Sequence, residues 1–515
     1  MTVTAVTGAL NIGGNTTVGA LTSDGAITIG SGKLLTTSTF TGDPGSALTI
    51  QVSRSTGTET GGKLVATNSA IDLSNTTLNI SVAGSSQPLI AGSTIVIANG
   101  NAPGTGPLTA IRDNSFLYDF SVAPTAGDNL TLTVNQTTSF AGSASNSNNA
   151  NVAQVLLGNL ANSIDPQINE IQSKLVGAST KAAFNNILEA TLPVVDGGNI
   201  LTAVDMMDGT LDITDQRMAM VRTGESGVAA GDPAGTGTGV WMQAFGQHAT
   251  QDGQDDVAGY SARTWGGVFG LDSTDYFDDA LVGADFVYSR ADVDSDNANA
   301  ARTIVDSYQV TLYGTRYFDR RMFINGMFAG AWDQDKSTRF DVGGVSGLDA
   351  EGRYTAMQGA ARLAAGRDYD WGGMTLTPGI LGDYLYFNQR HYTETGAGGA
   401  DLTVGYGNFN QLDLGASLKA AWTLKDDVGD VTKPGIHAGY RYDLLNDDIQ
   451  ATSNFTAGGP SFTTAGLTPG RSIFNVGADI KYATPASWEF SAGYDFEAKS
   501  GYTANSGIVR AGYKF

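Results

Sequence analysis

The chain has 515 residues, no cysteine, 68 glycines and a formal net charge of −22, and this length indicates two or three domains. The acidity argues against a nucleic-acid partner, which needs clustered Lys and Arg, and the lack of cysteine excludes disulfides and thiol chemistry. No run of 18 apolar residues occurs, so any membrane span must be a β-barrel.

Residues 1–138 are rich in Gly, Thr, Ser and Asn and contain short alternating runs at intervals of about twenty residues or less. Met1 is followed by a polar segment rather than a secretory signal, so we expect a fragment of a longer protein. Recurring short strands with turn residues between them predict a parallel β-helix that buries one face by stacking. The last part, in which Phe116, Tyr118, Phe120 and Val122 alternate, predicts an aromatic hairpin that caps the stack.

Residues 139–238 are predicted to be a linker with helices. Ser139 to Ala150 is mostly Ser, Asn and Ala, which is typical of a linker, and apolar residues at helical spacing then continue until Pro193. A second helix is predicted over Ala203 to Thr223. Its four aspartates share one helical face, which indicates either a solvated surface helix or a helix with polar partners; they are Asp205, Asp208, Asp212 and Asp215.

From Gly239 to Phe515 the odd and even positions differ sharply in polarity, as in transmembrane β-strands. Around Trp488, for example, aromatic residues alternate with Glu489, Ser491 and Asp495. We count twelve strands, beginning near residues 239, 258, 280, 304, 322, 353, 374, 408, 434, 471, 486 and 505. The fold class is therefore mainly β, with a β-helical region, a helical linker and a twelve-stranded antiparallel barrel.

The predicted connections alternate between long and short, which orients the barrel. Long ones follow odd-numbered strands, at residues 333–352, 392–407 and 444–470, whereas 319–320, 370–373 and 484–485 are short. Long loops face outside and short turns face the periplasm. A soluble β-sandwich is the alternative, but it would not carry charges on one face of nearly every strand.

The final residues form an alternating apolar set that ends on an aromatic residue: Val509, Ala511, Tyr513 and Phe515. This ending looks like the signal by which outer-membrane barrels are recognised for insertion. The stretch from Ile213 to Arg222, followed by a Gly-rich gap and residues 239–246, is similar to the junction of pore helix and first strand in monomeric autotransporters of the type Va class. The chain resembles that family over nearly its whole length.

This resemblance implies a barrel that carries an N-terminal passenger to the cell surface, with the helix plugging the pore. A twelve-stranded barrel leaves a lumen about one helix wide, and about 20 helical residues span the membrane. We expect the helical aspartates, with Arg217 and Arg222 on the same helix, to meet inward basic residues of the strands, namely Arg441, Lys481, Arg510 and Lys514. Gly209 in mid-helix predicts either a close barrel wall or a helix break.

No catalytic residue, cofactor site or metal site is expected. The three histidines all lie after residue 239, so no Ser-His-Asp set can form in the passenger. Asp292 to Asn297 begins like a calcium loop but lacks the required Gly and Glu, so we interpret it as a solvated acidic outer loop, with a weak divalent-ion site as the alternative. The helix contains no Asn pair of the kind at which some relatives cut themselves.

The predicted function is secretion and surface display of the passenger as an adhesin or surface coat. The expected partners are outer-membrane lipid and lipopolysaccharide, the barrel-assembly machinery, periplasmic chaperones and an unknown surface ligand, around a monomeric barrel. The alternatives are a passive porin and the anchor of a surface enzyme whose catalytic part lies upstream.

Overall fold

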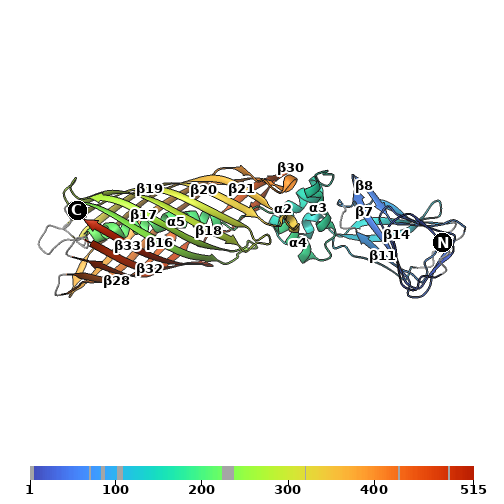
Figure 1. Cartoon of the computed structure of the whole chain (residues 1–515), viewed down its shortest axis with the longest axis horizontal. Helices are drawn as coiled ribbons and strands as arrows, with labels where there is room; N and C mark the ends of the chain where they lie inside the picture. Colours follow the sequence, from blue (N-terminus) through green and yellow to red (C-terminus); the bar gives the residue numbers. More distant parts are fainter. Residues whose placement is uncertain are drawn as a thin grey trace.

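The computed structural model describes residues 5–68, 71–82, 87–100, 108–222, 237–318, 321–426, 430–484 and 488–514. The molecule is elongated, with an N-terminal β-region at one end, a long barrel at the other and a group of helices between them (Figure 1). The C-terminus lies at the barrel end that is farthest from the N-terminus.

The N-terminal β-region consists of three sheets whose strands stack mainly in parallel. One sheet has the order β1-β4-β7-β11-β13, a second β10-β6-β3 and a third β14-β15-β12-β9-β5-β2, and β8 pairs with β7. The strands are β1 (Ala9–Ile12), β2 (Thr16–Thr17), β3 (Leu21–Ser23), β4 (Ala26–Ile29), β5 (Leu34–Thr37), β6 (Phe40–Gly42), β7 (Ala47–Ser55), β8 (Thr58–Gly61), β9 (Lys63–Ala66), β10 (Ile71–Asp72), β11 (Thr77–Val82), β12 (Thr94–Asn99), β13 (Ala110–Asp113), β14 (Tyr118–Thr125) and β15 (Asn129–Gln136).

Alternating apolar residues fill the inside of this stack, which confirms the predicted parallel arrangement. Ile27 lies over Leu48, Leu48 lies over Leu78, and all three are at most 2% exposed. One rung is longer than the expected twenty residues or less, since Ala47 pairs with Thr77 of the next rung. This rung is longer because β7 continues into an antiparallel hairpin with β8.

The predicted aromatic hairpin is formed by β14 and β15, which pair antiparallel from Tyr118 and Gln136 to Thr125 and Asn129. Tyr118 and Phe120 are buried. Phe116 precedes the strand and its ring lies 5.8 Å from that of Phe184 in the next region. The hairpin therefore contacts the helices that follow it.

The middle region contains short helices, here called the cap helices: α1 (Phe140–Ser143), α2 (Ser147–Ala153), the π-helix η1 (Gln154–Asn159), α3 (Pro166–Val176) and α4 (Lys181–Glu189). The interpretation of residues 139–150 as a linker is therefore wrong for most of that segment. Ser139 and Asn146 cap two of these helices by accepting backbone N–H groups. Their polar side chains signal helix N-termini as well as linkers.

The barrel has twelve antiparallel strands and closes between its first and last strand, where Gly239 pairs with Lys514. All twelve predicted starting positions lie within three residues of the observed ones. The strands are β16 (Thr238–Gln251), β17 (Tyr260–Ser273), β18 (Ala280–Ser295), β19 (Arg302–Phe318), β20 (Met322–Arg339), β21 (Ala350–Arg367), β23 (Met374–Gln389), β26 (Phe409–Trp422), β28 (Val431–Asp443), β31 (Ser472–Ala483), β32 (Trp488–Lys499) and β33 (Tyr502–Lys514). The predicted fold class is confirmed.

Side-chain polarity alternates along each strand, so that apolar residues face outward and polar or charged residues face the lumen. Phe474, Val476 and Ile480 are each at least 50% exposed, whereas inward Asp383 and Asp413 are at most 1% exposed. No helix in the described ranges is long and apolar enough to span a membrane.

The long connections are more ordered than predicted. Strands β20 and β21 occupy half of the expected loop 333–352, and the remaining residues 340–349 contain the short helix η2 (Val342–Gly344). The connections after β23 and β28 together form a four-stranded sheet, here called the loop sheet, with the order β24-β25-β29-β30. Its strands are β24 (Tyr392–Thr393), β25 (Leu402–Tyr406), β29 (Gln450–Phe455) and β30 (Gly458–Ala465), and η3 (Gly398–Ala400) lies between the first two. Short strands β22 (Tyr369–Trp371) and β27 (Leu424–Lys425) lie at the opposite barrel end.

One apolar core continues from the β-helix through the cap helices into the loop sheet. It includes Leu132 of the β-region, Ile171 and Leu188 of the cap helices, and Val404 and Phe455 of the loop sheet, all of them at most 1% exposed. The N-terminal half is therefore packed onto the barrel.

Candidate functional site: the helix in the barrel lumen

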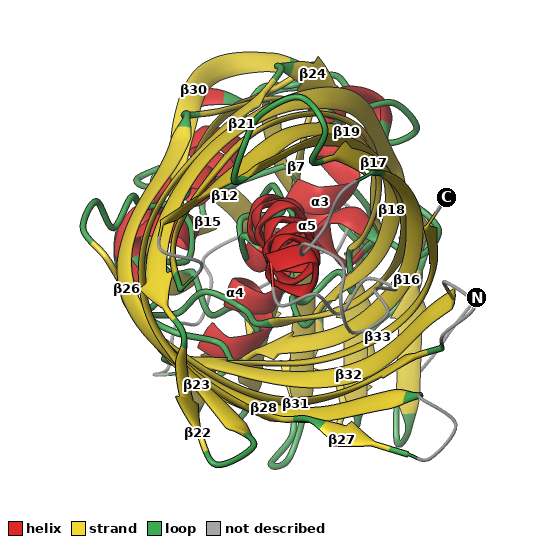
Figure 2. Cartoon of the chain, turned by 90° about the vertical axis from the view of Figure 1, so that its left-hand side faces the viewer, coloured by secondary structure: helices red, strands yellow, loops and turns green. Residues whose placement is uncertain are grey.

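A single helix, α5 (Gly198–Arg222), occupies the barrel lumen, as the view along the barrel shows (Figure 2). It begins five residues before the predicted Ala203, and Thr223 lies outside the described residues. Eighteen of its 25 residues are buried. A helix with so many buried polar residues requires polar partners on the barrel wall.

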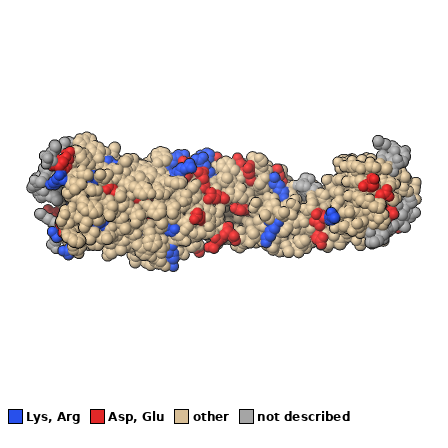
Figure 3. Space-filling model, turned by 90° about the horizontal axis from the view of Figure 1, so that it is seen from below, with Lys and Arg blue, Asp and Glu red and all other residues tan. Residues whose placement is uncertain are grey.

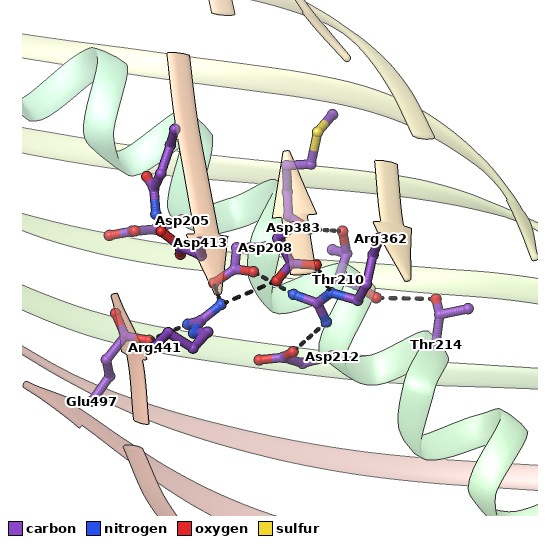
Figure 4. Close-up of polar contacts among 12 residues, drawn as sticks. Asp205, Asp208, Thr210, Asp212, Thr214, Arg362, Asp383, Asp413, Arg441 and Glu497 are labelled. Atoms are coloured by element: carbon purple, nitrogen blue, oxygen red, sulfur yellow. Dashed lines mark hydrogen bonds and ion pairs between the residues drawn. The ribbon is translucent and has the colours of Figure 1, made fainter. Parts of the chain in front are cut away.

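The centre of the site is Arg362 on β21, which was not predicted (Figure 4). Its guanidinium lies 2.5 Å from a carboxylate oxygen of Asp208, of Asp212 and of Asp383. Two of these carboxylates belong to α5 and the third belongs to β23. One cation therefore ties the helix to two strands.

A second cation, Arg441 on β28, approaches the helix close to the first (Figure 4). It lies 2.6 Å from Asp208 and 2.9 Å from Glu497 on β32. Asp208 therefore accepts from two arginines, one on each of its oxygens. Charges removed from water in this way are tolerated only when paired and hydrogen-bonded.

The other predicted aspartates contact different strands. Asp205 lies 3.0 Å from the Lys499 ammonium and accepts at 2.5 Å from the Tyr502 hydroxyl. Asp215 accepts from the Asn325 amide at 2.6 Å. The acidic face thus contacts strands on several sides of the barrel.

Two threonines bond the side of α5 that faces β18 and β19. Thr210 donates to Gln309 at 3.0 Å, and Thr214 donates to Asp285 at 2.9 Å. Each hydroxyl shares its single proton with a backbone carbonyl of the helix, that of Met207 at 2.7 Å from Thr210 and that of Thr210 at 3.0 Å from Thr214. These bonds hold α5 against one wall of the barrel.

The last turns of α5 are held by its two arginines. Arg217 makes a bidentate pair with Asp272, at 2.6 and 2.9 Å, and Asp272 also accepts from Tyr313 at 3.0 Å. A Cβ at Gly239 would lie 2.7 Å from the Arg217 guanidinium, so the glycine makes room for this pair. Arg222 lies 3.1 Å from Asp368 and 3.6 Å over the Phe323 ring.

The four basic residues that were predicted to contact the helix differ in the groups that they contact. Arg441 contacts Asp208 as described. Arg510 donates to the Met220 sulfur of α5 at 2.9 Å and lies over the Trp241 ring. Lys481 is 3.6 Å from Asp479 on the barrel wall, and the Lys514 side chain lies outside the described residues.

Sequence reasoning missed Arg362, Lys499 and most of the acidic wall residues. Each of them is a charged residue at an inward position of a barrel strand, so the alternation that identified Arg441 applies to them equally. Of the terminal set, Val509 faces outward and is 60% exposed, the Tyr513 side chain is not described, and Phe515 lies outside the described residues.

A cavity of about 240 Å³ lies on the opposite side of α5, between the helix and strands β23 to β33. Its lining includes Asp212, Gly209, Lys419, His437 and Asp495. A Cβ at Gly209 would meet no atom within 4 Å, and the helix is continuous there. Both explanations predicted for Gly209 are therefore wrong, because the residue faces this cavity.

The segment that leaves the lumen, residues 190–197, is enclosed by barrel loops. Arg339 at the end of β20 donates to the carbonyls of Thr191 and Leu192 at 3.2 and 3.3 Å and pairs with buried Glu394 at 2.5 Å. Asp196 accepts from the Gly198 amide at 2.8 Å. Burial raises the pKa of Asp196 to about 6.

Among the described residues, no group of three or more His, Asp or Glu is arranged to hold a metal ion. The predicted loop at Asp292 to Asn297 is instead largely part of β18, and Asp292 lies 2.7 Å from Arg302. His437 lies 2.6 Å from Asp495 in the lumen.

A closed antiparallel barrel with an apolar exterior and a polar lumen defines the class of bacterial outer-membrane barrel proteins. Residues 240–495 match the family described as Autotransporter beta-domain. The chain belongs to the autotransporter family and is a protein of the bacterial outer membrane.

Outer membrane protein B of Rickettsia prowazekii (strain Madrid E) is 26% identical over 397 residues, which cover 71% of this chain and 24% of that protein. An extracellular serine protease of Serratia marcescens is 25% identical over 191 residues, covering 36% of this chain and 18% of that protein. The chain thus spans 24% of the length of the first relative.

Among solved structures, the translocator domain of autotransporter NalP from Neisseria meningitidis aligns at 18% identity and a TM-score of 0.46, covering 60% of this chain and 98% of that one. The transport unit of the autotransporter AIDA-I from Escherichia coli aligns at 15% identity and a TM-score of 0.40, covering 58% and 97%.

Proposed function

We propose that this chain translocates its own N-terminal region through the outer membrane and displays it at the cell surface. The observation that carries the proposal is the course of α5. It enters the lumen at the end where the loop sheet lies and finishes beside Asp368, next to the short turns at the opposite end. The barrel begins at that end with Thr238.

The orientation follows from the connections. The loop sheet is built from the longest connections, and such loops face outside in outer-membrane barrels. Everything before Gly198 then lies outside the cell and the start of the barrel lies at the periplasm. Folding of the apolar core outside supplies a driving force, because each buried apolar residue opposes its return into a polar lumen.

A plugged secretion barrel is favoured over a passive porin by the contacts of α5. A porin lumen is open to solute, whereas here ion-paired or hydrogen-bonded side chains along α5, from Asp205 to Arg222, reach the wall. In this proposal α5 and the enclosed segment 190–197 seal the pore once the passenger is outside.

The displayed region is proposed to act as an adhesin or coat rather than as an enzyme. Its exposed surface is mostly Thr, Ser, Asn and Gly on β-strands, without the histidine that a Ser-His-Asp set requires. The proposed partners are lipopolysaccharide, a surface ligand, periplasmic chaperones and the barrel-assembly machinery, which would recognise the terminal aromatic residues.

The absence of cysteine allows a direct test of the orientation. Ile164→Cys introduces a thiol between η1 and α3 at a position that is 88% exposed, and Asp370→Cys does so in the short strand β22 at the opposite barrel end, where the side chain is 65% exposed. A membrane-impermeant maleimide added to intact cells should label the first variant and not the second, while both react after lysis. Labelling of Asp370→Cys alone on intact cells would refute the proposal.

A further inference from the structure

The outward faces of strands β17 to β23 carry an aromatic row and, beyond it, an arc of charged residues. The rings of Trp265, Tyr288, Tyr308 and Trp332 follow one another across four neighbouring strands, with centroids 5.8, 5.4 and 6.2 Å apart. Aromatic side chains of this kind mark the interface between hydrocarbon and head groups. The row therefore sets the height of the outer membrane boundary on this side of the barrel.

The charged residues begin one outward position above this row. Arg263 is two residues from Trp265 on β17, and Arg290 is two residues from Tyr288 on β18. Two residues of a tilted strand rise by about 5 Å, so these guanidinium groups lie at the level of the lipid head groups. The six basic members of the arc are Arg263, Arg290, Arg302, Lys336, Arg353 and Arg390.

These side chains point away from the barrel. The side chain of Arg353 is 71% exposed, that of Arg302 is 50% exposed and that of Lys336 is 40% exposed. Four acidic residues hold part of the arc in place. Asp306, for example, accepts from Arg290 at 3.0 Å and from the Tyr288 hydroxyl at 2.8 Å. The arc therefore holds more basic residues, six, than acidic ones, of which there are four: Asp292, Asp294, Asp306 and Glu351.

The arc covers only one side of the barrel. The corresponding outward strand positions on the other side are uncharged and include Asn410, Ser472 and Thr503. Arg471, which precedes Ser472, lies over the Tyr442 ring and donates to the carbonyls of Asp443 and Leu444. The space-filling view shows charged side chains gathered beyond a largely uncharged barrel surface (Figure 3). An arc of exposed arginines directly above an aromatic row is complementary to anionic groups held at the membrane surface, since arginine forms paired hydrogen bonds with phosphate.

We propose that this arc binds the phosphorylated head group of a glycolipid in the outer leaflet. In this interaction the arginines bond the lipid phosphates while the acyl chains lie against the aromatic row and the apolar strand faces below it. The paired carboxylates hold guanidinium groups such as those of Arg290 and Arg302 on the outer face of the barrel. The inference rests on the outer orientation given under Proposed function.

The test uses the full chain in detergent with Mg²⁺, titrated with bisphosphorylated lipid A and followed by native mass spectrometry. The arc variant combines Arg263→Gln, Arg290→Gln, Arg302→Gln and Arg353→Gln. The control variant changes basic residues at the opposite barrel end, with Arg316→Gln, Arg321→Gln and Arg367→Gln. A heat-dependent shift in gel mobility checks that both barrels are folded.

We expect the arc variant to bind lipid A at least tenfold more weakly than the native chain, and the control variant to bind within twofold of it. Lipid A without phosphates should bind the native chain as weakly as the arc variant binds the phosphorylated form. Equal binding by native chain and arc variant, or equal binding of both lipids, would overturn the proposal. Because detergent removes any dependence on orientation, this failure is distinguishable from failure of the cysteine-labelling test.

Discussion

Inside the barrel, α5 combines an apolar cluster shared with wall residues such as Trp241 and Phe387 with charged and hydrogen-bonded contacts, whereas outside the barrel the cap helices pack on the loop sheet mainly through apolar side chains. Asp208 and Arg362 are typical of the first region, and Ile171 and Leu188, which are fully buried, are typical of the second. The chain therefore contacts charged and hydrogen-bonding groups in the lumen and a mainly apolar surface outside it.

This difference fits the order of events in the proposed function. Charged wall residues such as Arg362 and Asp383 oppose the retention of apolar segments in the lumen, whereas the apolar surface of the loop sheet outside binds them as they emerge. Polar contacts in the lumen form only when the correct helix arrives in register, because each aspartate needs its own partner. The lumen therefore selects the final position of α5, and the cap holds the exported chain.

The largest effect is expected from Arg362→Ala, which leaves Asp208, Asp212 and Asp383 without their shared cation. Removal of one partner from a buried ion pair costs roughly 3–5 kcal/mol. Release of α5 from the wall should raise the single-channel conductance of the purified chain. Arg353→Ala, on the same strand but facing outward, is the control and should leave conductance unchanged; equal conductance of both variants would argue against the lumen network.

The substitution Ile171→Ala should weaken the apolar packing between the cap helices and the loop sheet. Loss of a fully buried isoleucine costs about 2–5 kcal/mol, and a Cβ at Gly343 would already lie 2.5 Å from this side chain, which indicates tight packing. Protease should cut the cap helices of this variant faster on intact cells, while conductance stays low because α5 is untouched. Ile164→Ala, at a position that is 88% exposed, should behave like the native chain, and raised conductance in Ile171→Ala would show that the two regions are not independent.

An intermediate effect is expected at Asp196, where the two regions meet. Its pKa is raised to about 6 by burial, above the value of about 3.9 in an unfolded chain. The stabilisation of segment 190–197 by the protonated Asp196 carboxyl is therefore fully present below about pH 4 and is lost as pH rises through 6. Protease cutting of segment 190–197 should accelerate by up to about tenfold per pH unit over this range, and Asp196→Asn should abolish the dependence; a pH dependence that persists in the variant would assign it to another group.

The smallest effect is expected from Gly209→Ala. Because nothing lies within 4 Å of the added Cβ and alanine favours helix by about 1 kcal/mol over glycine, the variant should resist thermal unfolding slightly better. A lower unfolding temperature would mean that the cavity beside α5 is needed by the native state.

The sequence predicted most of the barrel because each strand has to satisfy lipid on one face and the lumen on the other. This two-residue period predicted all twelve starting positions to within three residues and placed Arg441 inside. The same period is hard to recognise around Arg362, because the neighbouring residues on its side of the strand, Ala360 and Ala364, are not polar.

The parts that were missed depend on contacts between segments far apart in the chain. The Ser- and Asn-rich segment 139–150 has weak local preferences, and its helical form is fixed by contacts such as that of Asn148, which bonds the backbone of Ala465 in both directions at 2.8 and 2.9 Å. The role of Gly209 likewise depends on where the helix lies within the lumen, which no local pattern specifies.

The central claim, that α5 closes the pore through its own contacts, is tested most directly by single-channel conductance in planar bilayers. Three chains should be compared: the full chain, residues 198–515, which retain α5 without the cap, and residues 237–515, which are the barrel alone. We predict low conductance for the first two and a large conductance for the third. Equally large conductance for residues 198–515 and 237–515 would contradict the claim and assign the seal to the cap.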